Sequence, residues 1–123
     1  MSKILIVDDE PHLRLLYETE LRRAGFETMT AGNAAQGLEF VETMKPDLVI
    51  LDIRMAGMDG IEAMQRILER DNSIPVVLNT AFSSYRDNYL TWAADAYVTK
   101  SSDVSELVST VKGVLDNKAT AAN

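Results

Sequence analysis

The sequence predicts an α/β domain built on a five-stranded parallel sheet, doubly wound so that helices cover both of its faces. Leu48 to Leu51 form an unbroken apolar run, which is typical of a strand buried on both faces of a parallel sheet. Similar short runs lead up to Asp8 and Thr80, and segments with helical spacing of apolar residues separate them. This alternation at short spacing indicates right-handed crossovers between strands of one sheet.

Five strands and five helices are expected to alternate along the chain. The strands are expected at residues 3–8, 26–31, 47–52, 75–80 and 95–99. The helices are expected at residues 11–24, 34–44, 61–70, 83–92 and from about 104 to 117. Thr28 and Thr30 make the second strand more polar than the others, so we expect it at an edge of the sheet.

Local signals mark where these helices begin and end. Gly25 ends the first helix, Asn33 can cap the second, and Lys45-Pro46 stops the second before the central strand. Ser102 or Asp103 can cap the last helix. The apolar face expected for the first helix comprises Leu13, Leu16, Tyr17, Leu21 and Ala24.

The chain is expected to form a single domain over residues 1–123, with a core of about residues 3–117 and a frayed tail at 118–123. The absence of cysteine excludes disulfides, zinc–thiolate sites and cysteine nucleophiles. His12 is the single histidine, which excludes multi-histidine metal sites.

Charge and hydropathy limit the partners that the chain can bind. The net charge of −7 and a pI near 4.6 argue against direct binding to nucleic acid or to anionic membranes. No apolar stretch is long enough to span a bilayer or to act as a signal peptide. A cytoplasmic location is therefore expected.

Polar side chains gather where the predicted strands end. They are Asp8, Asp9, Asp52, Thr80 and Lys100. The carboxyl ends of parallel strands share one edge of the sheet, where ligands bind in open α/β folds. Three carboxylates offer the hard oxygen ligands that suit Mg²⁺, one carboxylate can attack phosphorus, and the hydroxyl and the ammonium can hold phosphoryl oxygens. The pattern favours Mg²⁺-dependent phosphoryl chemistry.

Each of these residues also has a purely structural alternative. Asp9 can cap the first helix before Pro11, and Asp52 can cap the loop that follows its strand. Lys100 can form an ordinary ion pair, and Thr80 can simply end a strand. Only the convergence of all of them at one edge indicates a functional site.

Five short motifs occur at successive strand ends. They are Val7-Asp8-Asp9-Glu10, Asp52-Ile53-Arg54-Met55, Gly57-Met58-Asp59-Gly60, Thr80-Ala81 and Tyr97-Val98-Thr99-Lys100. On these motifs the chain resembles a response-regulator receiver domain of bacterial two-component signalling, the family of the chemotaxis regulator CheY. The resemblance covers about residues 3–117 and implies the flavodoxin-like strand order 2-1-3-4-5.

The resemblance implies a signalling domain and not an enzyme. Asp52 would accept a phosphoryl group from the phosphohistidine of a sensor histidine kinase or phosphotransfer protein. Asp9, Asp52 and the backbone carbonyl of Arg54 would ligate Mg²⁺, and Asp8 would act through water.

The resemblance also implies how the signal leaves the domain. Lys100 and Thr80 would contact the phosphoryl group, and Tyr97 would be an aromatic switch that moves with Thr80. The switch would reshape the face formed by residues 83–92, the fifth strand and the last helix, which would bind a downstream protein. The implied state is a monomer or a weak, phosphorylation-dependent dimer.

Four positions call for separate comment. Ser101 follows Lys100 where the family usually has a proline after a cis bond; a cis bond before Ser101 would cost about 2.5–4 kcal/mol, so we expect a trans bond. Ala56 also stands where the family usually has proline. Arg54 and Phe82 occupy variable positions that flank the approach of water, and their bulk favours slow loss of the phosphoryl group.

Three rival functions remain open from the sequence. A Mg²⁺-dependent phosphatase with an aspartyl nucleophile would carry an Asp-x-Asp pair on the first strand, whereas Asp8 and Asp9 are adjacent. A flavin or nucleotide carrier would need a Gly/Ser/Thr-rich phosphate loop in place of these acids. A pseudo-receiver that only binds proteins would not need the complete set of acids.

Overall fold

The computed structural model describes residues 2–55, 57–81, 93–100 and 103–122. The strands are β1 (Lys3–Val7), β2 (Glu27–Ala31), β3 (Leu48–Leu51), β4 (Val76–Thr80) and β5 (Ala96–Thr99). The helices are α1 (Pro11–Arg23), α2 (Ala34–Met44), α3 (Gly60–Arg70) and α4 (Ser105–Ala122). The predicted helix at 83–92 lies outside the described residues, so α4 corresponds to the last helix of the sequence prediction.

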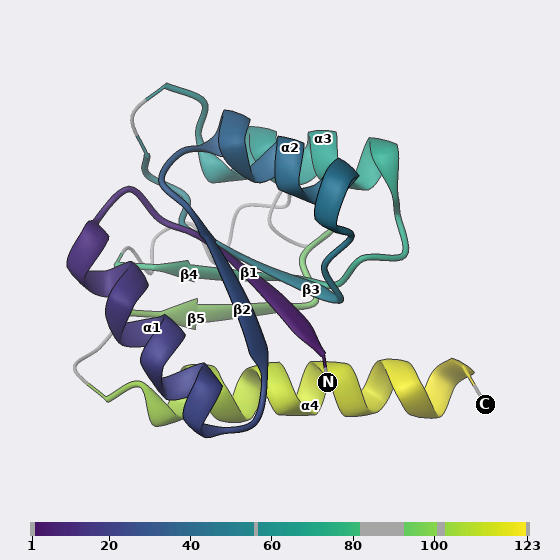
Figure 1. The fold of residues 1–123 in the computed structure, drawn as a ribbon. Coiled ribbons are helices and arrows are strands. Elements are labelled where there is room, and N and C mark those ends of the chain that lie inside the picture. The colour runs from purple at the N-terminus through teal and green to yellow at the C-terminus, as the bar shows by residue number, and fades with distance from the viewer. Residues whose placement is uncertain (1, 56, 82–92, 101–102, 123) are drawn as a thin grey trace.

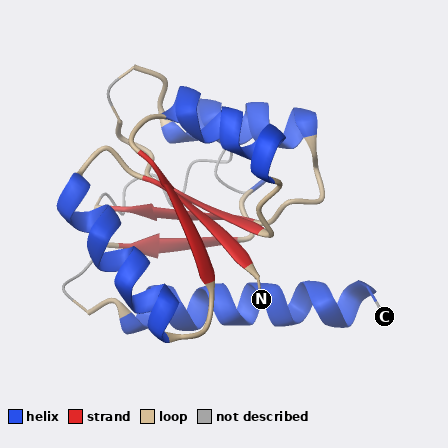
Figure 2. Ribbon diagram, in the orientation of Figure 1, coloured by secondary structure: helices blue, strands red, loops and turns tan. Residues whose placement is uncertain are grey.

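The five strands form one parallel sheet in the order β2-β1-β3-β4-β5, which confirms the predicted fold class and strand order. Helices α2 and α3 cover one face, and α1 and α4 cover the other (Figures 1 and 2). β2 is an edge strand, as predicted, and four of its five side chains are at least partly exposed. None of the described helices is long and apolar enough to cross a membrane.

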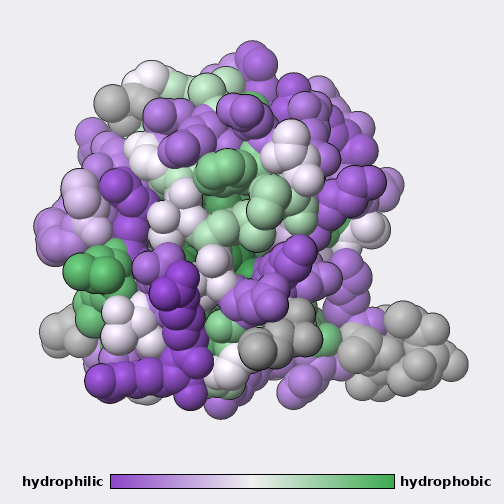
Figure 3. Space-filling view, viewed as in Figure 1, coloured by the Kyte–Doolittle hydropathy of each residue, from purple (hydrophilic) through white to green (hydrophobic). Residues whose placement is uncertain are grey.

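Side-chain alternation along the strands divides the core into two layers. Leu5, Val7, Val49, Leu51 and Leu78 face α2 and α3. On the other face of the sheet, the layer against α1 and α4 comprises Ile4, Ile6, Tyr17, Leu21, Leu48, Ile50, Val77, Val98, Leu107 and Val111. The surface seen in Figure 3 is largely hydrophilic, with hydrophobic residues gathered near its centre, in front of β2.

The structure corrects one expectation for the helices. Leu16 was expected on the buried face of α1, but 38% of its surface is exposed. The buried residues of α1 are Tyr17 and Leu21, which are four residues apart and so share one face of the helix. Leu16, which precedes Tyr17, lies beside this buried face and not on it. Helix α4 continues to Ala122, and no glycine or proline interrupts its last turns. The frayed tail expected at 118–123 stays a prediction.

Local contacts fix the ends of the helices. Asn33 caps α2, as predicted, by accepting a hydrogen bond from the Gln36 amide at 2.8 Å. The residue at the cap position of α1 is Glu10 and not Asp9. Asp103 accepts bonds from the backbone amide of Ser105 at 2.9 Å and from its hydroxyl at 2.6 Å, at the start of α4.

Two aspartates hold the amino ends of the strands in register. Asp47 Oδ2 accepts from the Lys3 amide at 2.7 Å, and the Asp47 amide donates to the Lys3 carbonyl at 2.8 Å. Asp95 and Val76 form the same reciprocal pair, at 2.9 Å and 2.8 Å. These pairs fix β3 against β1 and β5 against β4, so they also fix which residues meet at the opposite edge.

Gly60 allows α3 to begin directly against the backbone of Asp52. Its amide donates to the Ile53 carbonyl at 2.7 Å, and a Cβ at this position would overlap the Asp52 carbonyl oxygen. The atoms in the way are backbone, which cannot move aside as a flexible side chain would. Any larger residue must therefore displace either α3 or the end of β3.

We expect Gly60→Ala to lower the free energy of unfolding by about 1–3 kcal/mol, because the added methyl group overpacks a backbone contact. Gly113→Ala is the matched control, since a Cβ there meets nothing within 4 Å in the middle of α4. That change should raise stability by roughly 0.5–1 kcal/mol. Urea unfolding of both variants measures the difference, and a Gly60→Ala protein as stable as the wild type would contradict the packing argument.

Candidate functional site

The strand registers bring the predicted site residues to one edge of the sheet. Val7 pairs with Leu51, so Asp8 and Asp52 lie side by side just past the ends of β1 and β3. Thr80 pairs with Thr99, so Lys100 begins beside the end of β4. The Asp52 amide donates to the Val7 carbonyl at 3.1 Å, which continues the pairing beyond the strand.

The ammonium group of Lys100 lies between two buried carboxylates. Its Nζ is 2.7 Å from Asp8 Oδ2 and 2.9 Å from Asp52 Oδ2. Only 11% of the Lys100 side chain is exposed, with 3% for Asp8 and 7% for Asp52. Two acids share one cation, so this buried group carries a net negative charge.

The pKa values of both Asp52 and Lys100 are raised in this arrangement. Burial raises the pKa of the Asp52 carboxyl, and the opposing hydrogen bond and charge of Lys100 do not fully offset it. Burial alone would lower the pKa of Lys100, but its bonds to Asp8 and Asp52 outweigh that effect and raise it. Lys100 therefore stays protonated, and Asp52 is a more basic carboxylate than an exposed one.

The loop after β1 holds three acids together. One carboxylate oxygen from each of Asp8, Asp9 and Glu10 lies within 4.8 Å of the others. Asp8 is buried, whereas Asp9 and Glu10 are exposed. Glu10 is a member of this group that the sequence prediction did not include.

Backbone contacts fix the position of Asp8. Arg14 reaches back from α1 and donates to the Asp8 carbonyl at 2.6 Å. Asp8 Oδ1 accepts from the Glu10 amide at 3.0 Å, which leaves Oδ2 for Lys100. The hard oxygens of this group suit Mg²⁺, and the exposed pair leaves room for the waters that Mg²⁺ retains.

Thr80 and Tyr97 lie on the face of the sheet that is covered by α2 and α3. Thr80 is fully buried at the end of β4, and its hydroxyl bond lowers the pKa of Asp52 against the effect of burial. Tyr97 pairs with Leu78 and packs, partly buried, against the core layer on that face. The structure thus brings Thr80 to Asp52 and places Tyr97 on the same side of the neighbouring strand.

The remaining predicted residues are less closely tied to this cluster. Arg54 is exposed in the connection from β3 to α3. Phe82 and Ser101 lie outside the described residues, and so does the Lys100–Ser101 bond. The predictions made for them stand untested.

Two buried polar residues near the site were not singled out in the sequence. Asn79 is 2% exposed and precedes Thr80 on β4, and Tyr17 is 3% exposed on α1. Burial raises the pKa of Tyr17, a side-chain hydrogen bond with Asn79 and the charge of Lys100 oppose the rise, and the charges of Asp8 and Asp52 add to it, so Tyr17 lies close to the site. A polar residue inside the otherwise apolar run of β4 was the available signal.

Comparison with known proteins decides the family. The model of the response regulator receiver domain matches residues 4–112. This chain belongs to the response regulator receiver domain family. It is therefore a CheY-like domain of two-component signalling, and a signalling domain instead of a conventional enzyme, as the sequence motifs predicted.

A similar response regulator has been solved with Mg²⁺ and BeF and, separately, with a histidine kinase. The chain is 42% identical to the response regulator TrrA of Thermotoga maritima, solved in complex with Mg²⁺ and BeF, with a TM-score of 0.90 over 93% of this chain and 99% of that one. The complex of TrrA with the histidine kinase ThkA gives 43% identity and a TM-score of 0.88 over 94% of this chain and 99% of the matched one.

Curated relatives extend beyond the matched region. The chain is 39% identical over 116 residues to the DNA-binding response regulator MtrA of Mycolicibacterium smegmatis, which covers 93% of this chain and 50% of MtrA. The chain spans about half the length of most of the curated relatives that it matches.

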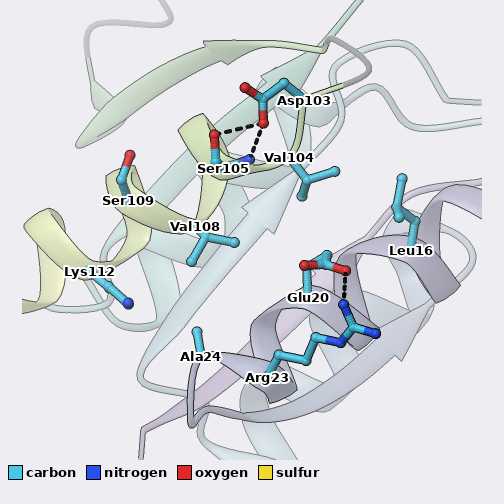
Figure 4. Close-up of a pocket in the computed structure, with 10 residues that line it drawn as sticks. All are labelled: Leu16, Glu20, Arg23, Ala24, Asp103, Val104, Ser105, Val108, Ser109 and Lys112. Atoms are coloured by element: carbon cyan, nitrogen blue, oxygen red, sulfur yellow. Dashed lines mark hydrogen bonds and ion pairs between the residues drawn. The ribbon is translucent and has the colours of Figure 1, made fainter.

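A separate groove of this receiver domain lies between α1 and the start of α4 (Figure 4). Leu16, Glu20 and Arg23 line it from α1, and Val104 and Val108 line it from the other side. Glu20 and Arg23 form an ion pair at 3.3 Å within it. None of the predicted site residues that the structure describes lines this groove, so it is distinct from the edge that carries Lys100.

We expect Asp52→Asn to raise the free energy of unfolding of the receiver domain at neutral pH. Because the pKa of Asp52 is raised in the folded state, the protonated carboxyl group favours folding below its unfolded pKa, and that contribution is lost as the pH rises through its folded pKa. Asparagine avoids this loss, and Lys100 keeps Asp8 as a partner. Urea unfolding from about pH 3 to pH 8 should show a gap between the two proteins that opens as Asp52 ionises.

Asp59→Asn is the matched control for this experiment. Asp59 caps α3 by accepting from the Glu62 amide at 2.9 Å, and asparagine caps helices as well. That variant should show no gain at neutral pH. An Asp52→Asn protein less stable than the wild type at neutral pH would contradict the electrostatic argument.

Proposed function

We propose that this receiver domain accepts a phosphoryl group on Asp52 from a sensor histidine kinase or phosphotransfer protein, in a Mg²⁺-dependent reaction. The observation that carries the proposal is the Lys100 ammonium held within 2.9 Å of an Asp52 oxygen, beside a second acid. A cation in this place can neutralise the charge of an incoming phosphoryl group.

Asp52 suits the part of nucleophile. Its carboxylate lies at the carboxyl end of the central strand, and burial makes it more basic than an exposed aspartate. Thr80 and Lys100 approach it from β4 and the end of β5, where they can hold two phosphoryl oxygens. Phosphoryl transfer needs mainly such positioning and charge neutralisation, so the chain needs no further catalytic group.

The acids of the first loop fit Mg²⁺. Asp9, Asp52 and the backbone carbonyl of Arg54 would ligate the ion, Asp8 would act through water, and the grouping of Glu10 with Asp8 and Asp9 adds another hard oxygen nearby. Bound Mg²⁺ neutralises the charge that builds up on the phosphoryl oxygens. The structure of TrrA in complex with Mg²⁺ and BeF supports Mg²⁺ as the cation for this chain.

The partners follow from the relatives and from the switch residues. TrrA was solved with the histidine kinase ThkA, which supports a kinase as the phosphoryl donor. Thr80 would move toward a phosphoryl group on Asp52, and Tyr97 would follow on the same side of the sheet. The output surface would be the face formed by residues 83–92, β5 and α4, in a cytoplasmic monomer or a weak dimer.

We expect the wild-type chain to gain one phosphoryl group when treated with acetyl phosphate and Mg²⁺, and none when EDTA replaces Mg²⁺. Intact mass spectrometry measures the gain. Asp52→Asn and Asp9→Ala should gain little, because one lacks the acceptor and the other a metal ligand. Asp59→Asn, an exposed acid in the neighbouring loop, should be labelled like the wild type.

Three outcomes would contradict the proposed function. Efficient labelling of Asp52→Asn would place the phosphoryl group on another residue. No labelling of a folded wild-type chain by either acetyl phosphate or a kinase would favour a pseudo-receiver that acts only by binding proteins. Labelling that turns over continuously to release inorganic phosphate at a high rate would favour a phosphatase.

We expect the phosphorylated protein to lose its phosphoryl group slowly, and Arg54→Asn and Phe82→Ala to speed the loss. Arg54 is exposed and long enough to cover the approach of water and to pair with phosphoryl oxygens. Decay of the phosphorylated species, followed by mass spectrometry, measures the rate. Arg66→Asn, an exposed arginine on α3, is the control that should leave the rate unchanged. Slower decay in Arg54→Asn would show that the arginine assists hydrolysis.

A further inference from the structure

A buried hydrogen bond joins helix α1 to strand β4 close to the site. The side chains of Tyr17 on α1 and Asn79 on β4 are hydrogen-bonded to each other. Both residues are almost completely buried, with 3% of Tyr17 and 2% of Asn79 exposed. The charges of Lys100, Asp8 and Asp52 all act on the Tyr17 hydroxyl, so the pair lies near the ion-paired cluster.

The surroundings of this pair are apolar. Val77 precedes Asn79 on the same face of β4, Val98 pairs with Asn79 from β5, and both valines belong to the core layer against α1 and α4. A hydrogen bond between two neutral side chains adds little net stability in such a place, and two apolar side chains of similar shape would pack there about as well. What the polar pair adds is a directional contact, which fixes where the two elements lie.

Asn79 occupies a critical position on β4. Leu51 pairs with Leu78, so the residues that follow them, Asp52 and Asn79, are neighbours on adjacent strands. The next residue is Thr80, whose hydroxyl is hydrogen-bonded to Asp52. A bond that fixes Asn79 therefore fixes the end of the strand that presents Thr80 to the phosphoacceptor.

Helix α1 is bonded to the site on its other side as well. Arg14, three residues before Tyr17, donates to the Asp8 carbonyl at 2.6 Å, and α1 directly follows the loop that holds the three acids. Strands β1 and β4 flank β3 on its two sides. One helix is thus bonded through two side chains to the strand ends on both sides of Asp52.

Under the proposed function, both of these strand ends contact the same ligand. The loop of acids after β1 would take part in holding Mg²⁺, and Thr80 at the end of β4 would hold a phosphoryl oxygen. Groups that bind one ligand together need a fixed relative position, and a small displacement weakens them greatly.

We propose that Tyr17 and Asn79 are positioning residues, whose buried hydrogen bond fixes the end of β4 against α1 and so holds Thr80 and the loop of acids in the relative position that Mg²⁺ and a phosphoryl group require at Asp52. The inference rests on the proposed function and deepens it. Neither residue touches the reacting atoms, and each acts through the element that carries it.

The test compares ligand affinity with stability in a double-mutant cycle. Tyr17→Phe removes only the hydroxyl, Asn79→Leu replaces the amide at similar volume, and the double variant puts two apolar side chains in contact. Leu21→Val is the matched control, because it removes apolar volume from the buried face of α1 one turn beyond Tyr17. The probe is beryllium fluoride with Mg²⁺, a phosphoryl mimic, titrated by calorimetry, and urea unfolding without ligand gives the stability.

We expect each single variant to have a lower urea midpoint, because it leaves one buried polar group without its partner. The double variant should recover the wild-type midpoint or exceed it. Beryllium fluoride should bind about fivefold more weakly to both single variants and to the double variant, as for the loss of one hydrogen bond. Leu21→Val should have a lower midpoint and unchanged affinity. Weak binding in a double variant of restored stability would not result from a merely structural role.

Wild-type affinity in all three variants of the cycle would overturn the inference and leave the proposed function intact. Recovery of affinity together with stability in the double variant would also overturn it, and so would an equal loss of affinity in Leu21→Val, because binding would then follow stability alone. No binding of beryllium fluoride and Mg²⁺ to the folded wild-type chain would overturn the proposed function together with this inference.

Discussion

The ammonium group of Lys100 between Asp8 and Asp52 is the interaction on which the rest of the site depends. Two carboxylates buried side by side would repel each other strongly and would be costly without a shared cation. The ammonium at 2.7 and 2.9 Å offsets that cost and leaves one excess negative charge. Burial raises the pKa of Asp52, and Lys100 does not fully offset that rise. The excess negative charge favours a cation beside the acids of the first loop.

The scaffold around this interaction holds it in place from several directions. β4 lies between β3 and β5, so the Lys100 side chain has to cross β4 to reach both acids. The aspartate pairs at the amino ends of β3 and β5 fix the strands along their length, and Gly60 allows α3 to begin against the Asp52 backbone. Asn79 lies on the crossed strand, beside Asp52 in register and directly before Thr80.

The sequence was most informative where a strand changes abruptly from apolar to charged. Asp8, Asp52 and Lys100 each follow such a run, and parallel topology obliges those ends to meet at one edge. The sequence did not single out Asn79, because its position beside Asp52 depends on the register between β3 and β4. A single strand does not encode that register. Leu16 was misplaced for a related reason, since helical periodicity gives the direction of a buried face but not its width.

The measurement that tests the account most directly is a crystal structure of the wild-type chain with Mg²⁺ and beryllium fluoride. The account predicts beryllium bonded to an Asp52 oxygen, with the Lys100 ammonium turned outward to contact a fluoride. A beryllium adduct on any other residue would contradict it. So would an adduct on Asp52 with Lys100 still bridging Asp8 and Asp52 and making no contact with fluoride.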